Sequence, residues 1–293
     1  MILKDYLTDR SALVDQALDG FLPKATVKPA TMHKAMRYSL FAGGKRLRPV
    51  LCLAAAEACG GALEPALPAA CAVECIHTYS LIHDDLPCMD DDDLRRGRPT
   101  SHKVFGEGIA VLAGDALLTV AFEILTAAQG TARYPVAALL KELSHAAGSR
   151  QLIAGQVADL EGEGKKLSLR ELRFIHEAKT AALLTASIRL GGMSANATPA
   201  KLEALTAFGM NLGLAFQVID DILDVTQTSE KLGKSAGKDV AAQKATYPAL
   251  LGLEKARKEA QRLTAASLAA LKPFGKKGDT LQIIAEYLLA REY

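Results

Sequence analysis

Apolar side chains recur along most of the chain at the spacing of an α-helix. In residues 1–22, for example, Leu7, Leu13, Val14 and Leu18 are roughly periodic, which predicts an amphipathic helix. No segment sustains the alternation of apolar and polar residues that is typical of a half-buried strand. The pattern therefore predicts an all-α protein, with further helices over 31–42, 50–59, 69–83, 108–128, 136–158, 169–190, 199–224, 247–271 and 281–289.

Glycine and proline divide these segments. Gly43-Gly44 is expected to end the helix over 31–42, and Gly191-Gly192 the helix over 169–190. The segment 69–83 is apolar on almost every side, which indicates a helix buried on most sides. Since neither a linker between domains nor a repeat of fixed period interrupts the pattern, we expect one domain over residues 1–293.

Composition narrows the function classes. The chain is 49% hydrophobic with a formal net charge of +2, so nothing suggests a nucleic-acid partner. Asp115 and Glu123 interrupt the longest apolar run, and the N-terminus lacks the apolar core of a signal peptide, so we expect no membrane span. Five cysteines without a C-x-x-C pair are typical of a reducing compartment, and we expect a cytoplasmic protein.

The first acidic cluster has six aspartates in the ten residues 84–93, directly after an apolar run. Two like charges about 4 Å apart repel by roughly 4 kcal/mol at an effective dielectric of 20, so such a cluster needs protons or cations. Hard oxygen ligands without a histidine or cysteine pattern favour Mg²⁺ shared with substrate phosphates. A solvated acidic loop is the alternative. Because Pro87 breaks or kinks a helix, we expect Asp90 to return towards Asp84.

A second acidic cluster follows far along the chain, at residues 217–224. Asp220 and Asp224 are one helical turn apart, and Gln217, Asp221 and Asp224 form one stripe on a helix. Apolar residues fill the positions between them, so these carboxylates are costly to bury alone. Two such clusters facing each other across a cavity would hold divalent metal and a polyphosphate.

Basic residues lie close to both clusters. Arg95 and Arg96 follow the first in a turn held by Gly97 and Pro99; they either neutralise the aspartates or bind phosphate, as guanidinium groups do. Lys179 in the middle of a helix either binds an anion or extends to solvent. Lys234, Lys238 and Lys244 belong to a lysine- and glycine-rich segment, which is either a lid or a solvated loop. His77 lies seven residues before Asp84, on nearly the same helix face, and is either a core residue or a substrate ligand.

An apolar pocket with a metal and phosphate site at its mouth suits a hydrophobic chain that carries a diphosphate. Mg²⁺ there acts as a Lewis acid and stabilises the charge that develops on a diphosphate leaving group. Departure of that group leaves a carbocation, which a dry pocket must protect from water.

The segments Asp84-Asp85-x-x-x-x-Asp90, Asp220-Asp221-x-x-Asp224 and Gly43-Gly44-Lys45-Arg46-x-Arg48-Pro49 resemble the trans-prenyltransferases, or polyprenyl synthetases. The likeness spans nearly the whole chain and is greatest to bacterial farnesyl diphosphate synthases. It implies a helical bundle around a deep central cavity, the isoprenoid synthase fold, usually in a homodimer. It also implies three Mg²⁺, with Mn²⁺ able to substitute.

The implied reaction is the condensation of isopentenyl diphosphate with dimethylallyl or geranyl diphosphate to give farnesyl diphosphate and pyrophosphate. By resemblance, the metal-binding residues are Asp84, Asp85, Asp90, Asp220, Asp221 and Asp224. Those for the allylic diphosphate are Arg95, Lys179, Thr180, Gln217 and Lys234. Those for isopentenyl diphosphate are Lys45, Arg48, His77 and Arg96.

Product length is assigned by resemblance to Tyr79 and Ser80, five and four residues before Asp84. A bulky residue there resembles a floor that stops growth at fifteen carbons, although a helix wheel places Tyr79 about 140° from Asp84. Three other functions stay open: a geranylgeranyl diphosphate synthase, a terpene cyclase, and a non-catalytic prenyltransferase subunit. A cyclase needs one diphosphate only, which would leave Lys45, Arg48 and His77 without a role.

Overall fold

The computed structural model describes residues 2–226 and 245–290. Its elements are helices joined by short turns, together with one short hairpin. In chain order they are α1 (Leu3–Phe21), α2 (Ala30–Leu40), α3 (Leu47–Ala58), η1 (Glu64–Ala66), α4 (Leu67–Asp84), β1 (Leu94–Arg95), β2 (Arg98–Pro99), α5 (Ser101–Phe105), α6 (Glu107–Thr126), α7 (Val136–Ala147), α8 (Leu152–Gly162), α9 (Leu169–His176), η2 (Glu177–Ala181), α10 (Ala182–Ser194), α11 (Pro199–Thr226), α14 (Tyr247–Leu251), α15 (Leu253–Ala270), η3 (Lys272–Gly278) and α16 (Asp279–Leu289).

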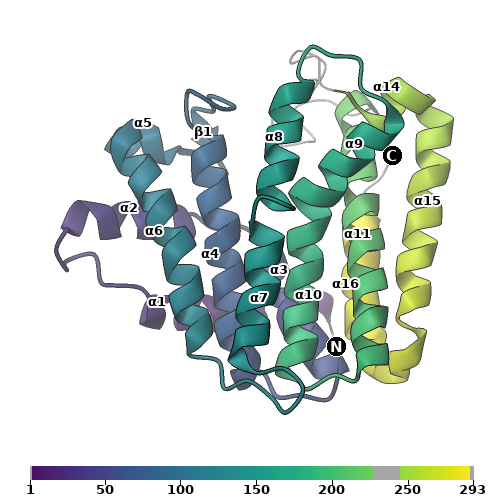
Figure 1. Ribbon diagram of the computed structural model, residues 1–293, viewed down its shortest axis with the longest axis horizontal. Helices are drawn as coiled ribbons and strands as arrows, with labels where there is room; N and C mark the ends of the chain where they lie inside the picture. Colours follow the sequence, from purple (N-terminus) through teal and green to yellow (C-terminus); the bar gives the residue numbers. More distant parts are fainter. Residues whose placement is uncertain (1, 227–244, 291–293) are drawn as a thin grey trace.

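The long helices run side by side and form a bundle (Figure 1). Helix α4 packs on α6, α10 packs on α3 and α11, and α11 packs on α15. The C-terminal ends of α4 and α11, which carry the two acidic clusters, both lie at the upper end of the bundle in Figure 1. The fold therefore brings together two clusters that are more than a hundred residues apart in the sequence. The predicted all-α fold is confirmed.

Two hydrophobic clusters form the core, one centred on α4 and α6 and the other on α11. Every side chain from 69 to 76 in α4 is at most 2% exposed, and His77, Ser80, Leu81 and His83 are half-buried, so the predicted burial of this helix on most sides is confirmed. Burying small apolar residues on most sides lets neighbouring helices approach closely and fixes the direction of α4. That direction decides where its terminal aspartate points.

Two predicted helix limits are wrong. The segment 136–158 is not one helix: α7 ends at Ala147, Gly148 adopts an extended conformation, and α8 begins at Leu152 and continues beyond Gly155. The Gly191-Gly192 pair does not end a helix either, because α10 continues to Ser194. A Cβ atom on Gly191 would lie 1.9 Å from the carbonyl oxygen of Cys52 in α3. This glycine permits close packing and does not terminate the helix.

Two further differences arise at turns. The predicted helix over 247–271 is divided at Gly252, whose φ of +83° is incompatible with a continuing α-helix. The basic turn over 94–99 contains a short antiparallel hairpin, in which Leu94 pairs with Pro99 and Arg95 with Arg98. Arg96 and Gly97 both have positive φ, as a tight two-residue hairpin turn requires.

Helices α6 and α11 are each long and apolar enough to cross a membrane by length and composition alone. Their most apolar windows are 44% and 50% buried in the bundle, and α11 carries the second acidic cluster. Core helices of a folded bundle have the same composition. The absence of a membrane span stays a prediction.

Candidate functional site

A cavity of about 660 Å³, the main cavity, lies between α4, α6, α8 and η2. Its walls are mainly apolar, and polar groups enter at one end. Seven of the predicted site residues line it: Arg48, His77, Tyr79, Ser80, Asp84, Lys179 and Thr180. A long apolar pocket with a charged mouth matches the expected substrate, a hydrophobic chain ending in a diphosphate.

The first acidic cluster lies at the mouth of this cavity. Helix α4 ends at Asp84, before Pro87, and the backbone N–H of Asp90 donates to the carbonyl oxygen of Asp84 at 2.8 Å. The predicted return of Asp90 towards Asp84 is therefore confirmed. Burial raises the pKa of Asp84 to about 6, with a further upward contribution from Asp90, while Lys179 opposes the shift. A carboxylate in this position is stabilised by a neighbouring cation.

Asp85 points away from the main cavity and is only 3% exposed. The Nε of Arg95 donates to both of its oxygens, at 2.7 and 2.9 Å. Burial raises the pKa of Asp85 in spite of this arginine. Arg95 and Arg96 line a separate cavity of about 30 Å³ beside Asp85. The structure thus places both arginines next to the predicted metal site, and neither lines the main cavity.

Asp220 and Asp221 of the second acidic cluster line a neighbouring cavity of about 200 Å³, together with Gln217 and Lys179. Asp221 accepts a hydrogen bond from the backbone N–H of Tyr247 at 2.8 Å, so its Oδ2 atom is held in place. Asp224 is 6% exposed, and its Oδ2 has no hydrogen-bond partner among residues 2–226 and 245–290. A buried carboxylate oxygen without a donor is costly unless a cation or a proton compensates it.

Lys179 connects the two acidic clusters. It lines both cavities and lies on η2, a π-helical turn, a geometry that is frequent at functional sites. Its Nζ donates to Asp159 of α8 at 2.7 Å. In the next residue, the hydroxyl of Thr180 donates to Gln217 Oε1 at 2.8 Å. The predicted allylic diphosphate residues 179, 180 and 217 are therefore adjacent in space.

Two of the four predicted isopentenyl diphosphate residues line the main cavity. Arg48 and His77 line it, and the enclosed position of His77, together with the charges of Arg48 and Arg96, holds the pKa of this histidine well below its usual range. Lys45 is exposed, with its Nζ 5.6 Å from the ring centre of Tyr287 in α16. The four residues thus surround the loop between α2 and α3 but do not share one cavity.

Tyr79 and Ser80 both line the main cavity with Asp84, although the helix wheel alone did not place Tyr79 there. Tyr79 is 5% exposed and contacts the His83 ring edge-on at 5.7 Å. His83 in turn lies 3.0 Å from the carbonyl oxygen of Val111. A Cβ on Gly114 would lie 2.2 Å from its imidazole, so this part of the wall is tightly packed.

Lys234, Lys238 and Lys244 lie outside the described residues. Their predicted roles stay predictions.

Among residues 2–226 and 245–290, one group of three potential metal ligands, Asp91, Asp93 and His102, has ligand atoms that all lie within 4.8 Å of one another. This group is not the predicted one, because the predicted aspartates are divided between α11 and the segment after α4. Asp93 is also paired with Lys103 at 2.7 Å. The group therefore offers an exposed, partly neutralised set of ligands beside the main site.

Sequence reasoning missed several residues that shape the site. Asp159 holds Lys179, and His176 lies between Asp221, at 3.9 Å, and the stacked ring of Tyr247, at 5.6 Å. Burial lowers the pKa of His176 to about 4. None of these residues belongs to a motif with a recognisable spacing. The one available signal was Asp159, which lies three residues after Gln156 on a helix that lines the cavity.

The residues present suit divalent metal. The donors at both walls are carboxylate oxygens, burial disfavours the charge of Asp84, and the buried Asp224 oxygen lacks a donor among the described residues. These are conditions that bound Mg²⁺ relieves, and oxygen-only donors are its usual ligands. Asp84, Asp90, Asp220, Asp221 and Asp224 would hold the metal, whereas Asp85 is engaged by Arg95.

An all-helical bundle in which an apolar cavity adjoins an acidic one, with Lys179 lining both, defines a class of enzymes that act on diphosphates of hydrophobic chains. The chain belongs to the polyprenyl synthetase family, whose sequence profile matches residues 29–286. The recognition of a trans-prenyltransferase and of the isoprenoid synthase fold is thereby confirmed.

Three relatives illustrate the likeness. A curated chloroplastic geranylgeranyl pyrophosphate synthase from Capsicum annuum is 51% identical over 99% of this chain and 79% of its own length. The crystal structure of a putative farnesyl-diphosphate synthase from Marinomonas sp. MED121 is 42% identical, with a TM-score of 0.86, and each chain covers 99% of the other. An FPP/GFPP synthase from Zymomonas mobilis is 37% identical, with a TM-score of 0.87 over 98% of both chains. The three relatives thus share the family, but their names refer to products of different chain length.

Proposed function

We propose that this protein is a Mg²⁺-dependent prenyltransferase that extends allylic diphosphates with isopentenyl diphosphate, and that its main product is geranylgeranyl diphosphate. The expected farnesyl product becomes the second candidate. One observation carries this preference: the Capsicum annuum geranylgeranyl pyrophosphate synthase is more similar, at 51% identity, than the two compared structures named for shorter or other products.

The chain's own residues supply binding, orientation and shielding. Lys179 and Thr180 would bind the allylic diphosphate, and Arg48 and His77, which line the same cavity, would bind isopentenyl diphosphate. Mg²⁺, when bound, supplies Lewis-acid stabilisation of the departing pyrophosphate. The apolar walls from α6 and α8 keep water away from the cationic carbon chain. His77, neutral because its pKa is low, adds no positive charge close to the reacting carbons.

Product analysis tests this proposal. The purified protein is incubated with dimethylallyl and isopentenyl diphosphates and Mg²⁺, and the dephosphorylated products are separated by chromatography. A twenty-carbon alcohol as the main product is the expected result, and accumulation of the fifteen-carbon alcohol would restore the farnesyl assignment. Asp220→Asn serves as the inactive control. Protein that turns over nothing, yet binds a second prenyltransferase chain tightly, would instead be a non-catalytic subunit.

A terpene cyclase can be distinguished from a prenyltransferase by the substrate that it needs. A cyclase releases a hydrocarbon from farnesyl diphosphate alone, without isopentenyl diphosphate. The basic loop between α2 and α3 disfavours this function, because a single diphosphate leaves Arg48 and His77 without an anionic partner. We expect no hydrocarbon in that incubation, whether Mg²⁺ or Mn²⁺ is supplied.

We also propose a cytoplasmic homodimer. Helix α6 is very apolar, with a mean hydropathy of 1.9 over its most apolar window, yet only 44% of that window is buried in one chain. Val104, Val111 and Leu112 stay exposed on this side of the bundle. A second copy would cover them, since exposed apolar patches mark interaction sites. Light scattering after size-exclusion chromatography should give twice the mass of one chain, and Leu112→Glu should lower it.

A further inference from the structure

Arg46 lies in the loop between α2 and α3, in the same short motif as Lys45 and Arg48. It is 3% exposed, whereas Lys45 is exposed and Arg48 lines the main cavity. Its φ of +46° is in the left-handed region, which is sterically unfavourable for a non-glycine residue. The surrounding contacts must therefore favour this conformation.

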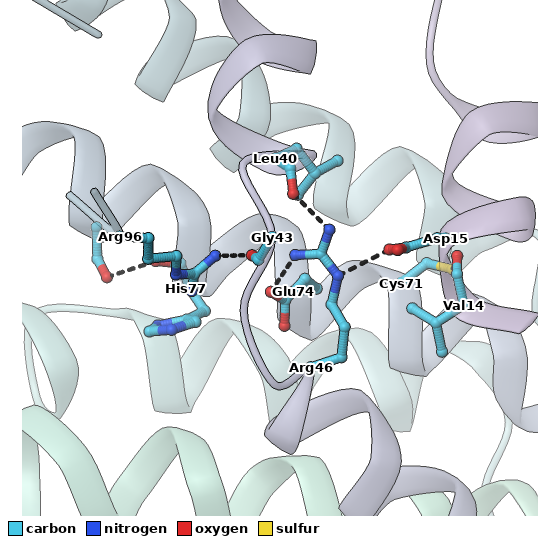
Figure 2. Close-up of polar contacts among 10 residues, drawn as sticks. Val14, Asp15, Leu40, Gly43, Arg46, Cys71, Glu74, His77 and Arg96 are labelled. Atoms are coloured by element: carbon cyan, nitrogen blue, oxygen red, sulfur yellow. Dashed lines mark hydrogen bonds and ion pairs between the residues drawn. The ribbon is translucent and has the colours of Figure 1, made fainter. Parts of the chain in front are cut away.

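The guanidinium of Arg46 binds three separate helices, as Figure 2 shows. Its Nε donates to Asp15 Oδ1 of α1 at 2.7 Å, and its Nη1 donates to Glu74 Oε1 of α4 at 2.9 Å. Its Nη2 donates to the carbonyl oxygen of Leu40, the last residue of α2, at 2.6 Å. Glu74 is itself only 2% exposed, so the pair is fully desolvated.

A second arginine holds the outer side of the same loop. The Nη1 of Arg96 donates to the carbonyl oxygen of Gly43 (Figure 2). A Cβ atom on Gly44 would clash with the guanidinium of Arg96. Gly43 and Gly44 both have positive φ, so the loop depends on these contacts for a single conformation. Arg46 therefore fixes the loop from inside the bundle, and Arg96 fixes it at the surface.

We propose that Arg46 is a positioning residue for isopentenyl diphosphate: by binding Glu74, Asp15 and Leu40 together, it orients Lys45 and Arg48 towards that substrate without touching it. A buried ion pair contributes little net stability after desolvation, which argues for a role in geometry. The inference depends on the proposed function, because it names the substrate that the loop binds.

The test compares binding of the two substrates. In Arg46→Lys the charge is kept but the three-way fork is lost, and we expect the KM for isopentenyl diphosphate to rise about tenfold, with the KM for the allylic diphosphate changed less than about twofold. Calorimetric titration of isopentenyl diphosphate alone, which cannot react without an allylic partner, should show the same loss. A fall in Tm with no difference between the two KM values would overturn the proposal.

Arg37→Lys is the matched control. Arg37 lies on α2, its side chain is also mostly buried, and it pairs with Asp19 of α1, but it donates to no residue of the loop 42–48. It should lower Tm while leaving both KM values unchanged. If Arg46→Lys does not fold, Glu74→Gln keeps the shape of the acceptor and removes only its charge. It should raise the isopentenyl KM by about threefold, and an unchanged KM would count against the proposal.

These outcomes are distinct from failure of the proposed function. If the wild-type protein neither binds nor consumes isopentenyl diphosphate, the proposed function fails. If it does both and Arg46→Lys keeps the wild-type ratio of the two KM values, the positioning role alone fails.

Discussion

The two acidic walls carry similar aspartate motifs on different supports. The first follows the end of α4 and runs into an irregular loop, where Asp90 is exposed and Asp85 is held by the fork of Arg95. The second lies within α11, a continuous helix whose carboxylates are fixed by helical spacing and by the backbone of Tyr247. The geometry of the first wall therefore depends on a loop, whereas a helix fixes that of the second.

Each wall also ties a basic side chain to an additional carboxylate. Arg95 binds Asp85 within the first wall, and Lys179 binds Asp159 from α8 beside the second. Each pair holds a cationic side chain close to an acidic cluster and partly neutralises it. The comparison indicates that the walls share the same chemistry and differ in their supports, and four experiments can break or sharpen it.

The largest expected effect is the loss of one metal-binding carboxylate from each wall. Asp84→Asn and Asp220→Asn should each lower kcat/KM by about a thousandfold or more, because metal stabilisation of the leaving group is worth several kcal/mol. Steady-state kinetics over a range of Mg²⁺ concentrations measures both. If excess Mg²⁺ restored Asp84→Asn but not Asp220→Asn, a first wall that adjusts to its ligand would be confirmed. Full activity in either variant would contradict a shared metal site.

A smaller loss is expected when Lys179 is released from its carboxylate partner. Asp159→Asn should lower kcat/KM for the allylic diphosphate by about tenfold, since a charge-assisted hydrogen bond then no longer orients the lysine. Steady-state kinetics at saturating isopentenyl diphosphate gives this value. Glu161→Gln, an exposed change on the same helix, should have no effect. Equal losses in the two variants would mean that Asp159 has no specific role.

The third experiment is expected to change the chain length of the product without changing the reaction rate. Tyr79→Ala removes a ring that lines the main cavity, so the product distribution should shift to longer chains. Tyr79→Phe removes only a hydroxyl that is buried without a partner among the described residues, and should leave the products unchanged. Chromatography of the two product mixtures decides the matter. If the product distribution of the alanine variant were unchanged, Tyr79 would be an ordinary core residue with no role in product length.

The smallest effect concerns stability and pH beside the second wall. Burial lowers the pKa of His176 from an ordinary 6.5 to about 4. Between these two pH values the histidine is therefore protonated in the unfolded chain and neutral in the folded protein. The free energy of unfolding should therefore decrease as the pH is lowered, by about 2 kcal/mol between pH 7 and pH 5 for this residue alone. Urea unfolding of wild type and His176→Gln at both pH values isolates the contribution, because the raised pKa of Asp84 acts in both proteins. Parallel pH dependence in the two would show that His176 is not buried as a neutral group.

Several features were predictable because they depend on local chemistry. Helical spacing identified the helices, Pro87 indicated the break that returns Asp90 to Asp84, and the periodicity of 217–224 placed its aspartates on one helix. The predictions failed where distant packing decides. Gly191 looks like a helix terminator in the sequence, but in the structure it allows α10 to pack closely against Cys52 of α3. Asp159 gains its role only because the fold places it next to Lys179 of η2.

The amino-acid sequence by itself determined the all-helical class, the two acidic clusters and the family, because spacing and residue type are properties of short segments. Tertiary structure alone decided which groups share a cavity: it brought Tyr79 into the wall beside Asp84, set Lys179 between the two acidic clusters and buried Arg46 against three helices. Such placements depend on how helices far apart in the chain pack, and that packing is a property of the whole core.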